Sequence, residues 1–143
     1  MVEARGNVVS FVACGVIKST PAFTFPQRIK EIHDGVLEVI DTHRPELAAV
    51  EDIFFAKNAS SALKLGQARG GILIAILNRH LGAHEFTAKQ VKQAVAGYGQ
   101  ASKAQVQHMV RLLLNLSAPP SEDAADALAV ALCLTNHLRD GKA

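Results

Sequence analysis

Three carboxylates stand in stretches of sequence that are otherwise apolar. Glu51 lies in the run 47–55 (LAAVEDIFF), near the carboxyl end of a presumed central strand, where open α/β sheets bind their ligands. Asp123 and Asp126 are three residues apart at the start of an almost wholly apolar segment, so on a helix they would share one face. Each also has an ordinary explanation. Glu51 can reach solvent from a strand end, Asp123 can cap the helix, and Asp126 can be a surface residue favoured by the helix dipole.

A shared cation would explain the three carboxylates together. Unpaired carboxylates in apolar surroundings are costly to bury, and they repel one another unless a cation joins them. Oxygen-only ligands suit Mg²⁺ or Mn²⁺, and two such ions can activate water and stabilise the leaving oxygen in phosphodiester cleavage. We therefore predict that Glu51, Asp123 and Asp126 are catalytic acids that hold two Mg²⁺ (or Mn²⁺) ions. The six histidines have no metal-ligand spacing, and we expect them to be structural or surface residues.

The positive charge is concentrated in the middle of the chain. Residues 53–121 contain eight Lys and Arg but one acidic residue, whereas the remainder contains seven Lys and Arg and twelve acidic residues. This asymmetry favours a polyanion-binding surface over a solubilising face, because solubilising faces usually mix both signs. Aromatic side chains can stack on unpaired bases, and lysines near helix starts favour phosphate. The residues predicted to contact nucleic acid are Phe54, Lys57, Asn58, Lys89, Lys92 and Lys103.

Hydrophobic spacing and helix-start residues predict strands that alternate with helices. This pattern indicates one α/β domain over residues 1–143, with helices on both faces of a mixed sheet. Glycine inside a helix costs about 1 kcal/mol relative to alanine, so Gly66, Gly70 and Gly71 suggest close packing against a dimer partner or the protein's own sheet. The predicted elements are strands 7–18, 47–55 and 83–86, and helices 26–43, Ser60 or Ser61 to 81, 87–97, from 102, and 121–138.

The composition places the chain in the cytoplasm. No apolar run is long enough to span a bilayer, and the first residues lack the pattern of a signal peptide. Cys14 and Cys133 are far apart and lack CxxC spacing, so we expect two reduced core thiols.

Three blocks of the sequence resemble the RuvC family of Holliday-junction resolvases. The blocks are 50–70 (VEDIFFAKN, then SALKLGQARG), 89–110 (KQVKQAV, then KAQVQHMV) and 123–129 (DAADALA). The resemblance implies an RNase H-like fold and a homodimer that binds four-way DNA junctions and resolves them with paired nicks. It also implies the RuvA–RuvB branch-migration complex as a partner. The implied roles are metal-binding catalytic acids at Glu51, Asp123 and Asp126, crossover contacts at Phe54 and Lys57, DNA contacts near the cleavage site at Lys92 and Lys103, and a dimer interface along the helix of Gly66 and Gly70.

The amino-terminal sequence departs from the family's pattern. The family opens with a strand ending in Gly-Ile-Asp-Pro-Gly, whose Asp is a fourth metal ligand, and this segment does not occur here. We therefore expect an RNase H-like chain that lacks the first strand and most of the second. If translation starts upstream of Met1, the gene product carries the missing strand and is an active resolvase. The alternative is a catalytically inactive protein that still binds junctions.

Overall fold

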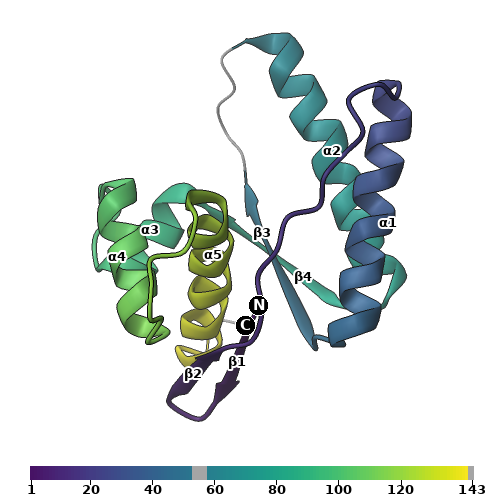
Figure 1. The fold of residues 1–143 in the computed structure, drawn as a ribbon. Coiled ribbons are helices and arrows are strands. Elements are labelled where there is room, and N and C mark those ends of the chain that lie inside the picture. The colour runs from purple at the N-terminus through teal and green to yellow at the C-terminus, as the bar shows by residue number, and fades with distance from the viewer. Residues whose placement is uncertain (53–57, 142–143) are drawn as a thin grey trace. The chain divides into compact units, whose positions relative to one another are not determined.

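The computed structural model describes residues 1–52 and 58–141. It contains two compact units, Met1–Gly15 with Phe86–Ala143 and Val16–Glu85, and each is considered by itself. Four strands form two two-stranded sheets in the described part of the chain, β1 with β2 and β3 with β4 (Figure 1). The elements are β1 Val2–Arg5, β2 Val8–Phe11, α1 Phe25–His43, β3 Leu47–Asp52, α2 Ala59–Asn78, β4 Gly82–Thr87, α3 Ala88–Ala96, α4 Lys103–Leu113 and α5 Glu122–Arg139.

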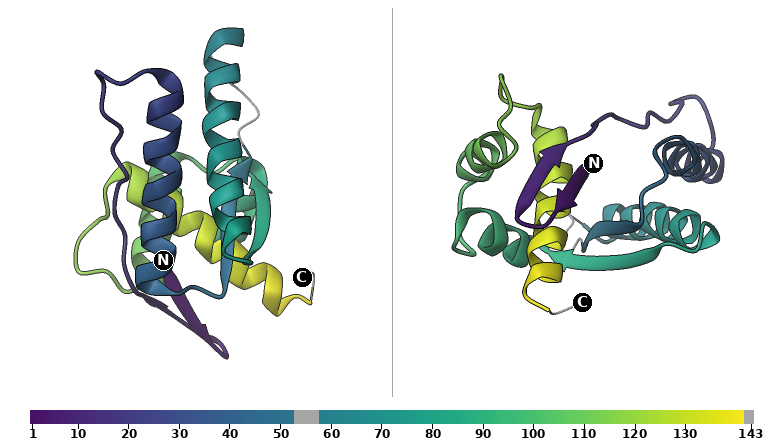
Figure 2. Two further views of the ribbon diagram at one scale, coloured as in Figure 1. Left: turned by 90° about the vertical axis from the view of Figure 1, so that its right-hand side faces the viewer. Right: turned by 90° about the horizontal axis from the view of Figure 1, so that it is seen from below.

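The unit Val16–Glu85 is built around the pair of helices α1 and α2, which lie side by side (Figure 2). A Cβ placed on Gly71 of α2 would lie 3.0 Å from Cγ2 of Ile29 on α1, so this glycine allows the two helices to approach closely. The far end of α2 is joined to α1 by Arg79, whose guanidinium donates to both carboxylate oxygens of Asp41 at 2.6 and 2.7 Å. Strand β3 pairs with β4, and α2 connects the two strands.

The helices begin at capping residues that the sequence marks, but one predicted cap is wrong. Thr24 and Gln27 form a capping box at the start of α1, and a proline occupies its first turn. Helix α2 is capped by Asn58, whose side chain accepts a hydrogen bond from the amide of Ser61 at 2.9 Å. The predicted cap at Ser60 or Ser61 is therefore wrong, because the asparagine two or three residues earlier satisfies the free amide and leaves both serines inside the helix.

In the other unit, β1 and β2 form an antiparallel hairpin in which Val2 pairs with Phe11. Gly6 turns the chain with a φ of 58°, a conformation that glycine adopts without strain. The predicted strand 7–18 is too long, since β2 ends at Phe11 and the amides of the next two residues both donate to the carbonyl of Met1. Beyond that point β-propensity alone does not hold a strand without a partner.

Helix α5 forms the centre of this unit. Nine of its residues are buried, among them Leu128, which has no exposed surface, and α3 and α4 both pack against it. Ser102 and Thr87 cap α4 and α3 as the sequence predicts. The prediction of a buried helix after residue 121 is confirmed, because its apolar residues cover most of its circumference.

The two cysteines lie in different environments. Cys133 is buried in α5 and Cys14 is exposed, so the prediction of two core thiols holds for Cys133 and is wrong for Cys14. Burial raises the pKa of the Cys133 thiol. Among the described residues, none of the helices combines the length and the apolar character needed to cross a membrane.

We predict that Leu128→Ala lowers the free energy of unfolding by about 2–5 kcal/mol, because it removes a fully buried side chain and leaves a cavity. Urea denaturation followed by circular dichroism measures this loss. Leu112→Ala is the matched control, since Leu112 on α4 is 58% exposed, and it should change stability by less than about 0.5 kcal/mol. Equal losses in the two variants would contradict the central role of α5.

Candidate functional site

The carboxyl end of β3 carries Glu51 and Asp52, both half-buried. Arg69 of α2 reaches this end of the strand. Its Nε donates to the backbone carbonyl oxygen of Glu51 at 3.4 Å, and its Nη2 lies 3.5 Å from Oδ1 of Asp52. Its Nη2 also pairs with the carboxylate of Glu85 on β4. One guanidinium therefore bridges α2, β3 and β4 at the strand end that holds the predicted catalytic glutamate.

The amino-terminal end of α5 carries the other two predicted acids. Ser121 caps the helix, because its hydroxyl accepts a hydrogen bond from the amide of Ala124 at 3.3 Å. Asp123 therefore does not serve as the cap, and that ordinary explanation is wrong. Asp123 is exposed and Asp126 is half-buried, one turn apart on the same face. Their neighbours Ala124 and Ala125 are buried, so the helix backbone holds both carboxylates at the edge of the apolar core.

Lys103, at the start of α4, pairs with this acidic end of α5. Its Nζ lies 2.5 Å from Oε1 of Glu122. The hydrogen bond to Glu122 raises the pKa of Lys103, and the negative charges of Glu122, Asp126 and Asp123 raise it further. The structure thus brings the predicted DNA-contacting lysine together with the two predicted acids of α5.

The predicted metal ligands come from both units. Glu51 lies in Val16–Glu85, whereas Asp123 and Asp126 lie in the unit that contains α5. Across residues 1–52 and 58–141, no group of three or more His, Cys, Asp or Glu side chains is placed to hold a metal ion. The three-residue metal site therefore stays a prediction.

Most of the positive charge predicted for a polyanion surface is engaged within the chain. Arg69, Arg79 and Lys103 form ion pairs with acidic side chains, and Arg111 donates to backbone carbonyls of the α4–α5 connection. Lys89 and Lys92 of α3 form no ion pair with any described residue. In the unit that contains α5, the positive charge that remains available is thus concentrated on α3. The polyanion-binding surface is therefore narrower than the sequence suggests.

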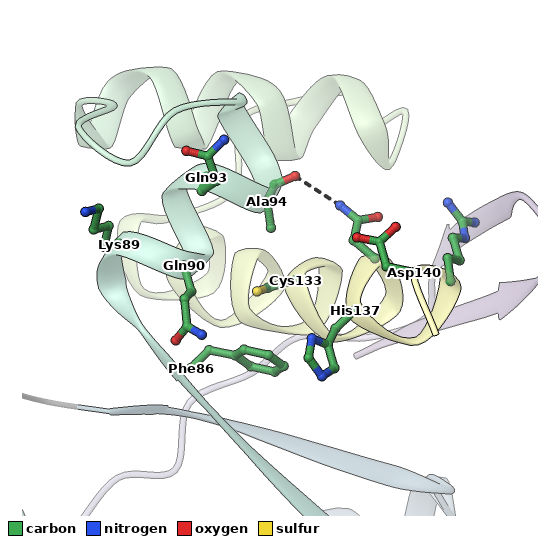
Figure 3. A pocket seen from close by; sticks show the side chains of 10 residues that line it. Phe86, Lys89, Gln90, Gln93, Ala94, Cys133, His137 and Asp140 are labelled. Atoms are coloured by element: carbon green, nitrogen blue, oxygen red, sulfur yellow. Dashed lines mark hydrogen bonds between the residues drawn. The ribbon is translucent and has the colours of Figure 1, made fainter. Parts of the chain in front are cut away.

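A pocket of about 630 Å³ lies between α3 and α5 (Figure 3). The ring of Phe86 meets His137 edge-on, with centroids 5.5 Å apart, and the side-chain amide of Asn136 donates to the carbonyl of Ala94 at 3.0 Å. Lys89 lies at the rim, where a Cβ on Gly99 would come within 2.7 Å of its Cγ. Gly99 therefore leaves room for the stem of a predicted DNA-contacting lysine.

Three of the remaining predicted residues, Asn58, Gly66 and Gly70, lie at the start of α2 or within it. Phe54 and Lys57 fall outside the described residues. Asn58 has the structural role of capping α2, and its amide group faces the helix start. A Cβ on Gly66 or Gly70 would meet no described atom within 4 Å, so neither glycine is required for packing against residues 1–52 or 58–141.

Sequence reasoning missed Arg69 and Glu122. Both form contacts with residues at least 16 positions away, and no local pattern marks them. The sequence signals at these positions are an arginine that precedes the apolar second half of the helix and an acid next to Asp123.

Comparison with known proteins places the chain in a family. Residues 1–134 match the family model of the crossover junction endodeoxyribonuclease RuvC. A protein of that name from Citrifermentans bemidjiense is 53% identical over 133 residues, which cover 93% of this chain and 81% of the relative. One from Saccharophagus degradans is 50% identical over 126 residues, covering 88% of this chain and 73% of the relative. The chain belongs to the RuvC family.

Solved RuvC structures agree with this assignment and with the RNase H-like α/β fold predicted from the sequence. Thermus thermophilus RuvC matches with a TM-score of 0.87 and 38% identity, covering 99% of this chain and 87% of the other. The structure of T. thermophilus RuvC in complex with a Holliday junction substrate matches with a TM-score of 0.90 at the same identity and coverage.

We predict that the pKa of Glu122 lies below its ordinary value and returns towards that value in Lys103→Met. The hydrogen bond from Lys103 is the largest cause of the lowered pKa, so the ion pair forms at neutral pH and is lost as the pH falls through the lowered pKa. An NMR titration of the side-chain carboxyl measures both values. Glu31 is the control, because Thr20 lowers its pKa and the substitution should leave it unchanged. An unaltered Glu122 titration in Lys103→Met would disprove the pairing.

Proposed function

We propose that this RuvC family member is a Holliday junction resolvase, an endonuclease that cuts four-way DNA junctions in recombination and repair by paired, metal-dependent hydrolysis. The observation that carries the proposal is the match to the endonuclease family over residues 1–134. Relatives at about half identity over most of the chain bear the name of the enzyme. An inactive junction-binding protein is not favoured, because the relatives that match most of the chain are named as nucleases.

The proposed metal ligands are Glu51, Asp123 and Asp126, and the proposed cofactor is Mg²⁺ or Mn²⁺, with two ions per active site. An all-carboxylate set suits these hard cations. The fit is supported by the start of α5, where Asp123 and Asp126 lie one turn apart on the same face of the helix. When bound, the ions would supply an activated water and charge neutralisation on the leaving oxygen.

The chain's own residues would position these groups. Asp126 is half-buried on a helix whose inner faces are packed, so the backbone that carries its carboxylate is held in place. Glu51 would contribute its carboxylate from the carboxyl end of β3. Lys103 would exchange its contact with Glu122 for a DNA phosphate near the cut, because a phosphate oxygen offers the ammonium an equally strong charge-assisted hydrogen bond.

Binding of the junction would rest on α3 and on Phe54, Lys57 and Asn58. Lys89 and Lys92 carry charge that no described acid neutralises, which suits contacts to the phosphate backbone. Phe54, Lys57 and Asn58 would engage bases and phosphates at the crossover, by stacking and by polar or ionic contact. The proposed place of action is the cytoplasm, and the proposed partner for branch migration is the RuvA–RuvB complex.

We further propose a homodimer that uses the outer face of α2. Leu63, Gly66, Gly70, Ile74 and Leu77 follow one another at intervals of three or four residues, so they form one stripe along the helix. Leu63 is 68% exposed, and Ile74 and Leu77 are each 54% exposed. With open space around both glycines, a second copy could approach the backbone closely. A symmetric dimer would supply the two active sites that paired cuts need.

We predict that Asp126→Asn lowers the rate of junction cleavage about a thousandfold while junction binding persists. Metal ions contribute several kcal/mol to such reactions, and each 1.4 kcal/mol is a factor of ten in rate. A nicking assay on a synthetic four-way junction with Mg²⁺ or Mn²⁺ measures the rate, and a gel-shift titration measures binding. Glu51→Gln and Asp123→Asn should behave in the same way.

Two controls separate catalysis from binding. Glu38→Gln changes an exposed carboxylate of α1 and should cut at the wild-type rate. Lys92→Ala should weaken junction binding and reduce its salt dependence by about one counterion. Cleavage by Asp126→Asn at the wild-type rate would overturn the proposed function.

We predict that Gly70→Leu raises the dimer dissociation constant at least about tenfold, since it places a side chain where the second copy should approach. Each tenfold change corresponds to about 1.4 kcal/mol. Sedimentation equilibrium measures the constant, and circular dichroism checks that the variant is folded. Ala104→Leu adds the same side chain to an exposed position of α4 and should leave association unchanged. A Gly70→Leu protein that dimerises as tightly as wild type would refute this interface.

A further inference from the structure

We propose that Arg69 is a positioning residue, which fixes the end of β3 so that Glu51 is presented to the metal ions. This inference rests on the proposed function, because it assigns a role only if Glu51 is a ligand. Arg69 contacts Glu51 through the backbone carbonyl, and its other partners are Asp52 and Glu85. All four residues lie in the unit Val16–Glu85.

The geometry suits an arginine. A guanidinium has five donors in a planar fork, and here they reach a backbone oxygen and two carboxylates on two strands. Side chains alternate between the faces of a strand, so holding Asp52 on the Arg69 side directs Glu51 to the opposite face. The one guanidinium therefore holds the backbone of Glu51 in place while it pairs with the side chain of the next residue, Asp52.

The charges of the group support the same role. The side chain of Arg69 is 20% exposed, so its contacts are less screened by solvent than those of a surface ion pair. Asp52 and Glu85 balance its positive charge, which limits its repulsion of a nearby divalent cation. Without Arg69 the two carboxylates would face each other unneutralised, and the ends of β3 and β4 would be pushed apart.

Arg79 provides a matched comparison within the same helix. It also forms an ion pair with a carboxylate, through two hydrogen bonds to Asp41, but it lies at the other end of α2 and is 39% exposed. Arg79→Gln therefore removes a comparable interaction without touching the end of β3.

The test compares Mn²⁺ binding by the full chain in three variants, Arg69→Gln, Arg69→Lys and Arg79→Gln. Electron paramagnetic resonance of free Mn²⁺ measures binding without any reaction. We expect Arg69→Gln to weaken Mn²⁺ binding about 10–100-fold, the usual loss when a group behind a ligand is removed. Arg69→Lys, which keeps the charge but loses the fork, should give an intermediate loss, and Arg79→Gln should bind as wild type. At saturating Mn²⁺, the cleavage rate of all three variants should lie within a few-fold of the wild-type rate. Their affinity for the junction should also lie within a few-fold of the wild-type affinity.

The possible outcomes are distinct. Wild-type Mn²⁺ affinity in a folded Arg69→Gln protein overturns the inference, and so do equal losses in Arg69→Gln and Arg79→Gln, which would indicate a general effect on stability. If Arg69→Gln does not fold, Arg69→Lys decides, and wild-type affinity there overturns the inference. Glu51→Gln separates this inference from the proposed function. Undiminished metal binding and cleavage in Glu51→Gln would refute Glu51 as a ligand, whereas a loss there with unchanged Arg69 variants refutes only the role of Arg69.

Discussion

The burial of α5 is the constraint on which the unit around it depends. Its apolar residues occupy almost every side of the helix, and α3 and α4 pack on them. The hairpin is joined to the same helix by Arg139, which donates to the carbonyl of Gly6 at 3.1 Å. Because the helix is held on so many sides, its first turn is held as well. Asp123 and Asp126 therefore extend from a fixed support, which a site needing defined oxygen positions requires.

Both groups of acids are accompanied by a basic side chain from a different element. Lys103 lies beside the acids of α5, and Arg69 lies beside those at the ends of β3 and β4. Neighbouring carboxylates repel one another, and a cation in contact offsets this cost. The two cases differ in exposure. The lysine side chain is 72% exposed and can exchange partners, whereas the arginine is largely enclosed and suits a permanent role.

Much of the fold could be predicted because the sequence marks its helix ends with local signals. Thr87 and Ser102 act through side-chain bonds to amides three residues on, and the prolines and glycines between apolar segments have equally short range. The errors occur where a competing local group or a distant partner decides. Asn58 takes the cap that either serine could have taken, and the amides of Val12 and Ala13, which follow β2, both donate to the carbonyl of Met1.

The candidate site was predictable only in part. Carboxylates in apolar sequence are conspicuous, so Glu51, Asp123 and Asp126 could be selected from composition and spacing. Their cationic neighbours could not, because Arg69 meets Glu85 and Lys103 meets Glu122 across gaps of 16 and 19 residues. Such contacts depend on how the helices and strands pack against one another, which the local sequence pattern does not predict.

Helix α2 serves a different neighbour on each of its sides. Gly71 meets α1, Arg69 meets the two strands, and the stripe that includes Gly70 faces outward. Inserting or deleting one residue before Arg69 would rotate the preceding turns by about 100° relative to the rest. After such a change, the residues of the helix before the insertion or deletion would face a different direction from Arg69 and Gly71, which contact the strands and α1. The length of α2 between Asn58 and Gly71 should therefore tolerate changes in residue type far better than changes in residue number.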